Sequence, residues 1–172
     1  MFDQPLQPSW RTGLAPGDIV AFRFPVVEEL HTPPPKIRPC LVLDIQTLGH
    51  VDFAVIAYGT SAETAANRGY DIHVTEAQER VVAGLRRPTR FVGSRRIMIA
   101  LDHPDFVVHG ALKTPVIGRL SGRSHHAMKR MWGRIRADQK RREQAMKTYS
   151  PPKFSPAPRV SDTLRNRPDS NT

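Results

Sequence analysis

The chain has 172 residues, 39% of them hydrophobic, with 16 prolines, one cysteine and a formal net charge of +10. A single cysteine excludes an internal disulfide and favours a reducing compartment. No apolar run reaches the ~20 residues that a membrane-spanning helix needs. We therefore expect one cytoplasmic domain with appendages, and neither a membrane protein nor a disulfide scaffold.

Eight strand-like segments follow an irregular lead-in over residues 1–16. Apolar residues at alternating positions, bounded by glycine and proline, predict short strands in these segments. The expected ranges are 19–24, 38–45, 52–59, 70–74, 84–92, 95–102, 106–112 and 114–120. Such spacing, with no long helical pattern in between, favours a small all-β barrel over residues 17–120.

Two segments have helical patterns instead. A capping box formed by Thr75 and Gln78 predicts a short helix over Thr75–Val82. A longer amphipathic helix is expected over residues 121–147, with Ser124 as its N-cap. Its apolar stripe, which should pack on the barrel, comprises Met128, Met131, Trp132 and Ile135.

The net positive charge lies entirely near the C-terminus. Residues 117–172 carry 14 Lys and Arg against 4 Asp and Glu, whereas residues 1–116 carry 12 of each. A neutral body with a basic end favours a polyanionic partner, nucleic acid above all, although solvated tails are often basic as well. Residues 148–172 are proline-rich without periodicity, which predicts a disordered tail.

The candidates for chemistry are arginines and hydroxyls at the ends of predicted strands. The chain has no phosphate-cradling glycine loop and no Cys/His ligand pairing, so we expect neither a metal nor a cofactor. Guanidinium groups bind phosphates and stabilise added negative charge, but each arginine can also be an ordinary solvated strand end. The candidates are Arg38, Thr60, Ser61, Arg90, Arg95 and Arg96. Cys40, within an apolar run, is expected in the core.

The order of several motifs adds a family resemblance. The motifs are GDIVAFRFP, KIRPCLVLDI, VIAYGTS, TRFVGSRRI and then GRLS before the amphipathic helix. In this order they resemble the MazF/PemK/Kid family of toxins from toxin–antitoxin systems, over about residues 17–137. The resemblance implies an SH3-like β-barrel that forms a homodimer and cleaves single-stranded RNA without a metal. It also implies a cognate antitoxin that neutralises the enzyme.

The resemblance also implies roles for particular residues. Arg38 matches the arginine of the family's RP motif, which contacts the scissile phosphate. Thr60 matches the active-site hydroxyl and has Ser61 as its neighbour, and Arg90 stands where some members place a second catalytic arginine. The family's aspartate two residues later is replaced here by Val92.

The first long loop also departs from the family, because Pro25 to Arg38 is longer and contains HTPPP. His31 in this loop is a candidate RNA contact, together with Ser61, Arg95 and Arg96. Two alternatives stay open. The barrel can bind nucleic acid or a protein through its basic C-terminal region without cutting, or the chain can be an unrelated small β protein.

Overall fold

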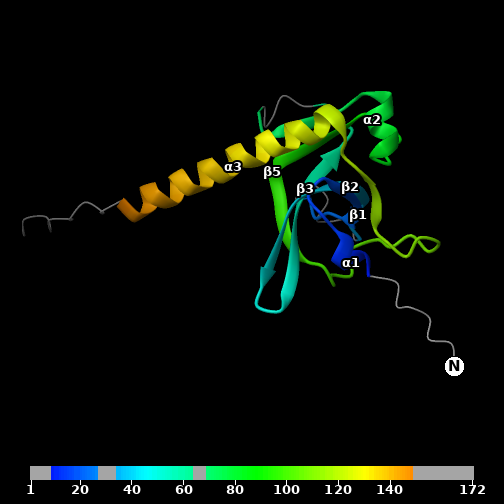
Figure 1. Ribbon diagram of the computed structural model, residues 1–172, viewed down its shortest axis with the longest axis horizontal. Coiled ribbons are helices and arrows are strands. Elements are labelled where there is room, and N and C mark those ends of the chain that lie inside the picture. The colour runs from blue at the N-terminus through cyan, green and yellow to red at the C-terminus, as the bar shows by residue number, and fades with distance from the viewer. Residues whose placement is uncertain (1–8, 27–33, 64–68, 149–172) are drawn as a thin grey trace, which may run out of the picture.

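The structure is a computed structural model that describes residues 9–26, 34–63 and 69–148. Six strands form one antiparallel sheet in the order β4-β5-β3-β2-β1-β6, curled into a half-barrel (Figure 1). The strands are β1 (Asp18–Arg23), β2 (Ile37–Leu48), β3 (Val51–Thr60), β4 (Asp71–Val74), β5 (Thr89–Ala100) and β6 (Val116–Arg119). The helices are α1 (Trp10–Gly13), α2 (Ala77–Val82) and α3 (Gly122–Thr148). The expectation of a mainly β fold with a C-terminal helix is confirmed.

Two hydrophobic clusters occupy opposite faces of the sheet, because strand side chains alternate between the faces. The first cluster gathers Ile19, Leu41 and Phe91 under α3. The second cluster gathers Phe22, Val42, Ile56 and Tyr58. Within the lead-in, α1 closes this second cluster, since the Trp10 ring packs 5.2 Å from the Phe106 ring and Leu14 is buried.

The Gly17-Asp18 pair at the start of β1 serves the fold. The Gly17 N–H donates to the Val42 carbonyl at 2.8 Å. The buried Asp18 carboxylate accepts from the Ala15 N–H at 2.8 Å and from the Arg119 Nε at 2.6 Å. These bonds join β1 to the turn before it and to the edge strand β6.

The expectation of two short strands with a break near residue 93 is wrong, because β5 is one strand. Val92 pairs with Tyr58, and Arg96 pairs with Ala57, the preceding residue of β3. Residues 93–95 therefore form a bulge between two consecutive pairs. A bulge interrupts the alternation of a strand in the same way as a turn, so the sequence pattern alone does not separate the two.

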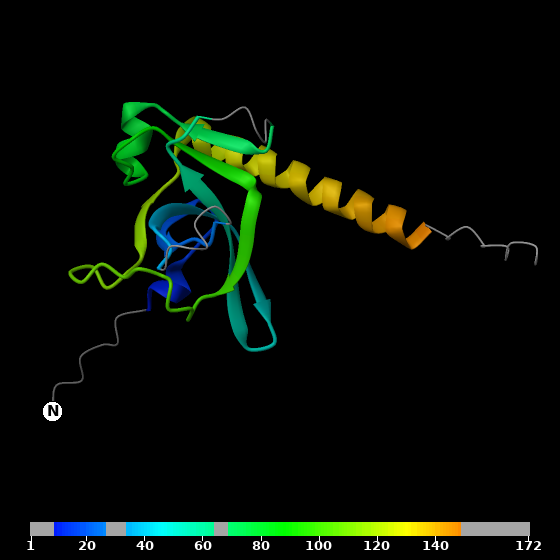
Figure 2. The same cartoon turned by 180° about the vertical axis from the view of Figure 1, so that it is seen from behind.

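The apolar stripe of α3 packs on the sheet as expected. Met128, Met131 and Ile135 are buried. The bulge at Gly93 makes room for them, since a Cβ there would lie 2.7 Å from Met131 Sδ and 2.9 Å from Ile135 Cδ1. Figure 2 shows α3 lying along β4 and continuing well past the sheet.

The start of α3 differs from the expectation, because Ser124 lies inside the first turn and is not the N-cap. Glu79 of α2 caps the helix instead. Its carboxylate accepts from the Arg123 N–H at 2.8 Å and from the Ser124 hydroxyl. The bond from Ser124 lowers the pKa of Glu79. A cap supplied from another helix leaves no local sequence signal.

The start of α2 also differs from the expected capping box. The helix begins at Ala77, and its N-cap is Glu76, which makes no side-chain capping bond.

Farther along α3, the Tyr70 hydroxyl donates to Asp138 and fastens the helix beside β4. Among the residues that the structure describes, no helix has both the length and the apolar character needed to cross a membrane.

Candidate active site

One cavity gathers three of the sequence-predicted residues. It has a volume of about 590 Å³ and lies where β2 begins and β3 ends. Arg38, Thr60 and Ser61 line it. Four further polar residues, which sequence reasoning missed, line the same cavity: Arg86, Arg87, Thr89 and His109.

The strand register explains why Arg38 and Thr60 meet. On β2 and β3, Cys40 pairs with Tyr58 in an antiparallel ladder. The recorded pairs end there, and continuing this register by two residues puts Arg38 opposite Thr60 on the same face of the sheet. Thr60 in turn pairs with Arg90 of β5. Three residues separated in sequence therefore form one row across three neighbouring strands.

A glycine before Thr60 permits the close approach of these strands. A Cβ at position 59 would lie 2.1 Å from the Pro39 carbonyl oxygen and 2.9 Å from the Phe91 ring. Neither atom belongs to a flexible side-chain end, so a larger residue would push β3 away from β2. Gly59 thus sets the spacing of Arg38 and Thr60.

Tyr58 orients two of the arginines. The Arg38 Cζ lies 5.2 Å and the Arg95 Cζ 5.7 Å from the centroid of its ring. Both distances are within the range of cation–π attraction, which is strongest where the ring is shielded from water. The ring is 8% exposed. Tyr58 therefore holds Arg38 and Arg95 on the same face of the sheet.

The buried Arg90 has a carboxylate partner on the neighbouring strand. Its Nη1 lies 3.5 Å from Asp71 Oδ2, and the same oxygen lies 3.1 Å from the His73 Nε2. Asp71 pairs directly with Val92 across β4 and β5. Asp71 thus puts a carboxylate directly across from position 92, where the family resemblance implies one. Sequence reasoning missed Asp71 because strand pairing, not sequence spacing, brings it there.

The remaining candidates lie elsewhere. Arg96 is turned toward α3, where its Cζ lies 5.9 Å from the centroid of the Trp132 ring, and it donates to the Gly93 carbonyl at 2.9 Å. It is therefore not part of the cavity. His31 falls outside the described residues.

The charges of the cavity favour an anion. Three arginines, Arg38, Arg86 and Arg87, line it, and no aspartate or glutamate of the described residues does. Guanidinium groups bind phosphate through paired N–H donors, and hydroxyls can orient the same oxygens. In the described part of the chain, no group of three or more His, Cys, Asp or Glu side chains is placed to hold a metal ion.

Cys40 lies two residues from Arg38 but is expected to be chemically inert. Burial raises the pKa of its thiol from an ordinary 9.0 to about 12, although the Gly59 N–H and the Arg38 charge both act to lower it. The nucleophilic thiolate is therefore rarer by a factor of about 10³ than in an exposed cysteine.

We expect Ellman's reagent at pH 8 to react with one thiol per chain in urea and with almost none in the folded protein. Above pH 9 the unfolded chain releases this proton and the folded one retains it, so the free energy of unfolding should fall as pH rises toward 12. Rapid, stoichiometric labelling of the folded protein would contradict the buried assignment.

No protein-family model matches the chain, and no curated protein matches it at a significant level. The likeness to the MazF/PemK/Kid toxins therefore remains one of motifs and their order.

Proposed function

We propose that the protein is an endoribonuclease that cleaves single-stranded RNA without a metal ion, as a cytoplasmic toxin with an SH3-like barrel of the MazF/PemK type. One observation carries the proposal: Arg38 and Thr60 line one cavity together with Arg86 and Arg87, and no acidic residue is among its described lining residues. The motif order that resembles this toxin family supports the same reading.

The proposed reaction is attack by a ribose 2′-oxygen on the adjacent phosphorus. The bond from phosphorus to the 5′-oxygen breaks, which leaves a 2′,3′-cyclic phosphate and a 5′-hydroxyl. Arg38 binds the scissile phosphate and stabilises the extra negative charge of the pentacoordinate state, while Thr60 and Ser61 orient its oxygens.

The proton of the 2′-hydroxyl needs a separate acceptor. An arginine is a poor base because its pKa exceeds ~12. His109 lines the cavity, and a neutral imidazole there can take the proton of the 2′-hydroxyl and return it to the departing 5′-oxygen. Arg86 and Arg87 then hold phosphates on either side of the scissile one.

A homodimer and a neutralising antitoxin belong to the same proposal, since both follow from the resemblance. The mouth of the cavity offers an apolar contact for a protein: Ile37 lines the cavity and is 49% exposed. An antitoxin that covers Ile37 would also block access to Arg38.

A second candidate function is nucleic-acid binding without cleavage. The observation that favours it is the composition of α3, which has nine Lys and Arg against two acidic residues. In that case RNA binding should weaken steeply with salt and the RNA should remain intact.

The two candidates are separated by incubating purified protein with single-stranded RNA in excess EDTA. The proposed endoribonuclease should cut the RNA at discrete positions and leave single-stranded DNA of the same sequence intact, since DNA has no 2′-hydroxyl. Intact RNA in EDTA with cleavage on addition of Mg²⁺ would refute the metal-independent reaction. RNA that stays intact under both conditions but is bound would favour the second candidate.

A further inference from the structure

A second groove, which we call the α3 groove, is separate from the cavity at Arg38. It has a volume of about 360 Å³ and lies between α3 and the strands β2, β3 and β5. This volume is within the range of sites for small ligands, ~300–1,000 Å³. The lining residues important here are Asp44, Gln46, Arg96, Met98, Trp132 and Arg136.

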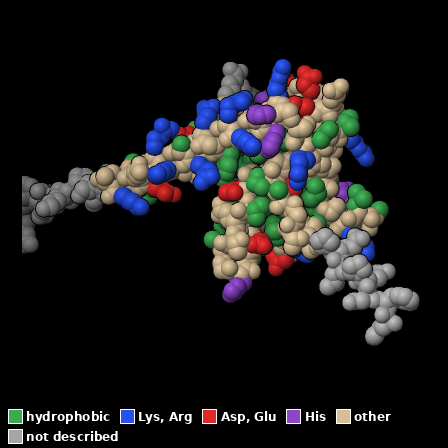
Figure 3. All heavy atoms as spheres, viewed as in Figure 1, with side chains coloured by type: hydrophobic (Ala, Val, Ile, Leu, Met, Phe, Trp, Pro, Cys, Tyr) green, Lys and Arg blue, Asp and Glu red, His purple; other side chains and the backbone are tan. Residues whose placement is uncertain are grey.

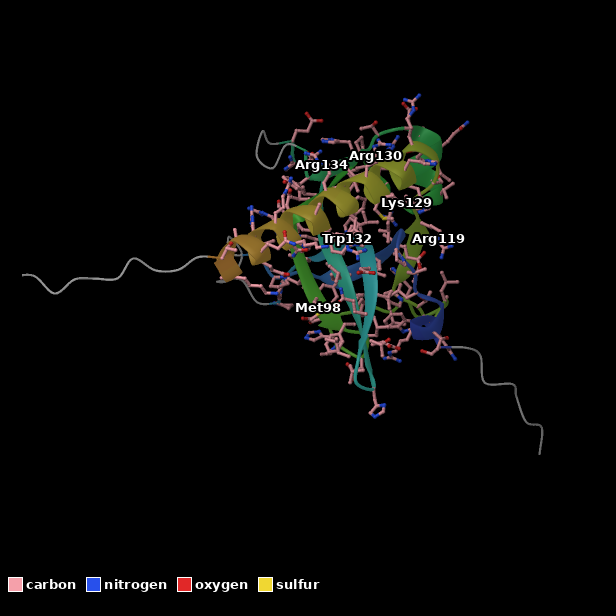
Figure 4. All side chains as sticks on the ribbon, turned by 60° about the vertical axis from the view of Figure 1, so that its left-hand side comes forward. Met98, Arg119, Lys129, Arg130, Trp132 and Arg134 are labelled. Carbon is pink, nitrogen blue, oxygen red and sulfur yellow. The ribbon has the colours of Figure 1, made fainter. Side chains whose placement is uncertain are left out.

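An aromatic ring forms one wall of the α3 groove. Trp132 is half-buried, so part of its indole packs on the first hydrophobic cluster and part remains accessible. Figure 4 shows Trp132 on the side of α3 that faces the strands, and Arg130 and Arg134 on the other side. Arg96 lies over this ring, with its Cζ 5.9 Å from the centroid, and the exposed part of the indole is a platform on which a nucleobase can stack.

Arginines surround this ring. Arg96 and Arg136 line the groove, and Arg142 is close enough to Arg96 for its charge to act together with burial in lowering the pKa of Arg96. None of these three arginines forms an ion pair within the described part of the chain. Their charge is therefore available to a ligand, and a partly desolvated Arg96 gains from an anionic one.

The opposite wall has a different character. The Asp44 carboxylate accepts from the Ile45 N–H at 3.0 Å and from the Gln46 Nε2 at 3.3 Å. A phosphate is repelled from this wall and directed to the arginines, whereas the N–H groups of a base are compatible with it. The α3 groove thus has one wall suited to phosphate, one suited to the edge of a base, and an aromatic face between them.

We propose that the α3 groove binds one nucleotide of a single-stranded RNA, with its base stacked on Trp132 and its phosphates held by Arg96 and Arg136. The choice of RNA as the occupant rests on the proposed function. Figure 3 shows Lys and Arg side chains along α3 from the sheet to the far end of the helix. The strand bound in the groove can continue along this basic surface.

The chain offers a direct optical readout, because it contains two tryptophans, Trp10 and Trp132. In a Trp10→Phe background, Trp132 is the single reporter. We expect titration with a single-stranded DNA 12-mer, which cannot be cut by 2′-oxygen attack, to quench its emission. Polyglutamate of equal charge should not quench it, since that polymer has no base to stack.

Substitutions then locate the site. Trp132→Leu should weaken DNA binding at least about fivefold, measured by anisotropy of a labelled strand. Arg136→Ala should reduce the slope of log affinity against log salt by about 1. Arg130→Ala removes the same charge from the other side of α3. It should change neither the quenching of Trp132 nor the slope of log affinity against log salt. Circular dichroism checks that each variant is folded.

Absence of quenching would overturn the α3 groove as a nucleotide site. Equal effects of Arg130→Ala and Arg136→Ala, or equal quenching by polyglutamate, would overturn it as well, because the surface would then sense only charge. RNA cleavage in EDTA is assayed on the same Trp10→Phe protein. Quenching without RNA cleavage supports the site and contradicts the proposed function, whereas cleavage without quenching does the reverse.

Discussion

Replacing Arg38 with alanine should lower the rate of RNA cleavage by about 10²–10³-fold and leave the fold in place. Arg38 lines the cavity together with Thr60, and its guanidinium is held over the Tyr58 ring, so in the proposed reaction the substitution removes a preorganised positive charge at the scissile phosphate. The loss should appear in the single-turnover rate measured in EDTA with saturating protein, where binding differences no longer contribute.

Two matched variants make this prediction specific. Arg38→Lys retains the charge but not the planar paired donors, and it should give an intermediate rate. Arg123→Ala removes an exposed arginine at the start of α3, outside the cavity, and should cleave like the natural protein. If Arg38→Ala remains folded and cleaves within threefold of the natural protein, Arg38 has no role in the chemistry.

Replacing Arg90 with alanine should have the largest effect on stability. The side chains of Arg90 and Asp71 are 7% and 11% exposed, so the substitution removes the arginine from a poorly solvated carboxylate that, among the described residues, keeps only His73 as a cationic partner when that imidazole is protonated. Removal of one partner of such a pair costs about 3–5 kcal/mol in the free energy of unfolding, which urea denaturation can measure.

A double-mutant cycle tests whether the ion pair is the cause. Adding Asp71→Ala to Arg90→Ala should cost less than Asp71→Ala costs in the natural protein, because the contact between Arg90 and Asp71 is already absent. Additive effects of the two substitutions would mean that the pair is not coupled. Cleavage should also fall in Arg90→Ala, since the register puts the Arg90 side chain next to that of Thr60 on the same face of β5 and β3.

Much of the sheet could be predicted from alternation of apolar residues. The strands β1, β2 and β3 lie where the pattern placed them, and the stripe through Met128, Met131 and Ile135 is buried. Arg38 and Thr60 could be proposed together because each stands at the end of a predicted strand. Antiparallel neighbours bring such ends to the same edge.

The features that sequence reasoning missed depend on contacts between distant segments. Asp71 reaches Arg90 through the pairing of β4 with β5, and Glu79 caps α3 from another helix. The bulge after Val92 turns Arg96 away from the cavity and toward Trp132. These residues are far apart in the sequence and follow no periodic pattern. Only the folded structure therefore shows that they are in contact.

The central claim is that the cavity at Arg38 cleaves RNA by attack of the 2′-oxygen. Mass spectrometry of the products of one defined RNA, cut in EDTA, tests this claim most directly. We expect fragments that end in a 2′,3′-cyclic phosphate, paired with fragments that begin with a 5′-hydroxyl, and we expect Arg38→Ala to produce neither. Fragments with a 3′-hydroxyl and a 5′-phosphate, or products that persist unchanged in Arg38→Ala, would contradict it.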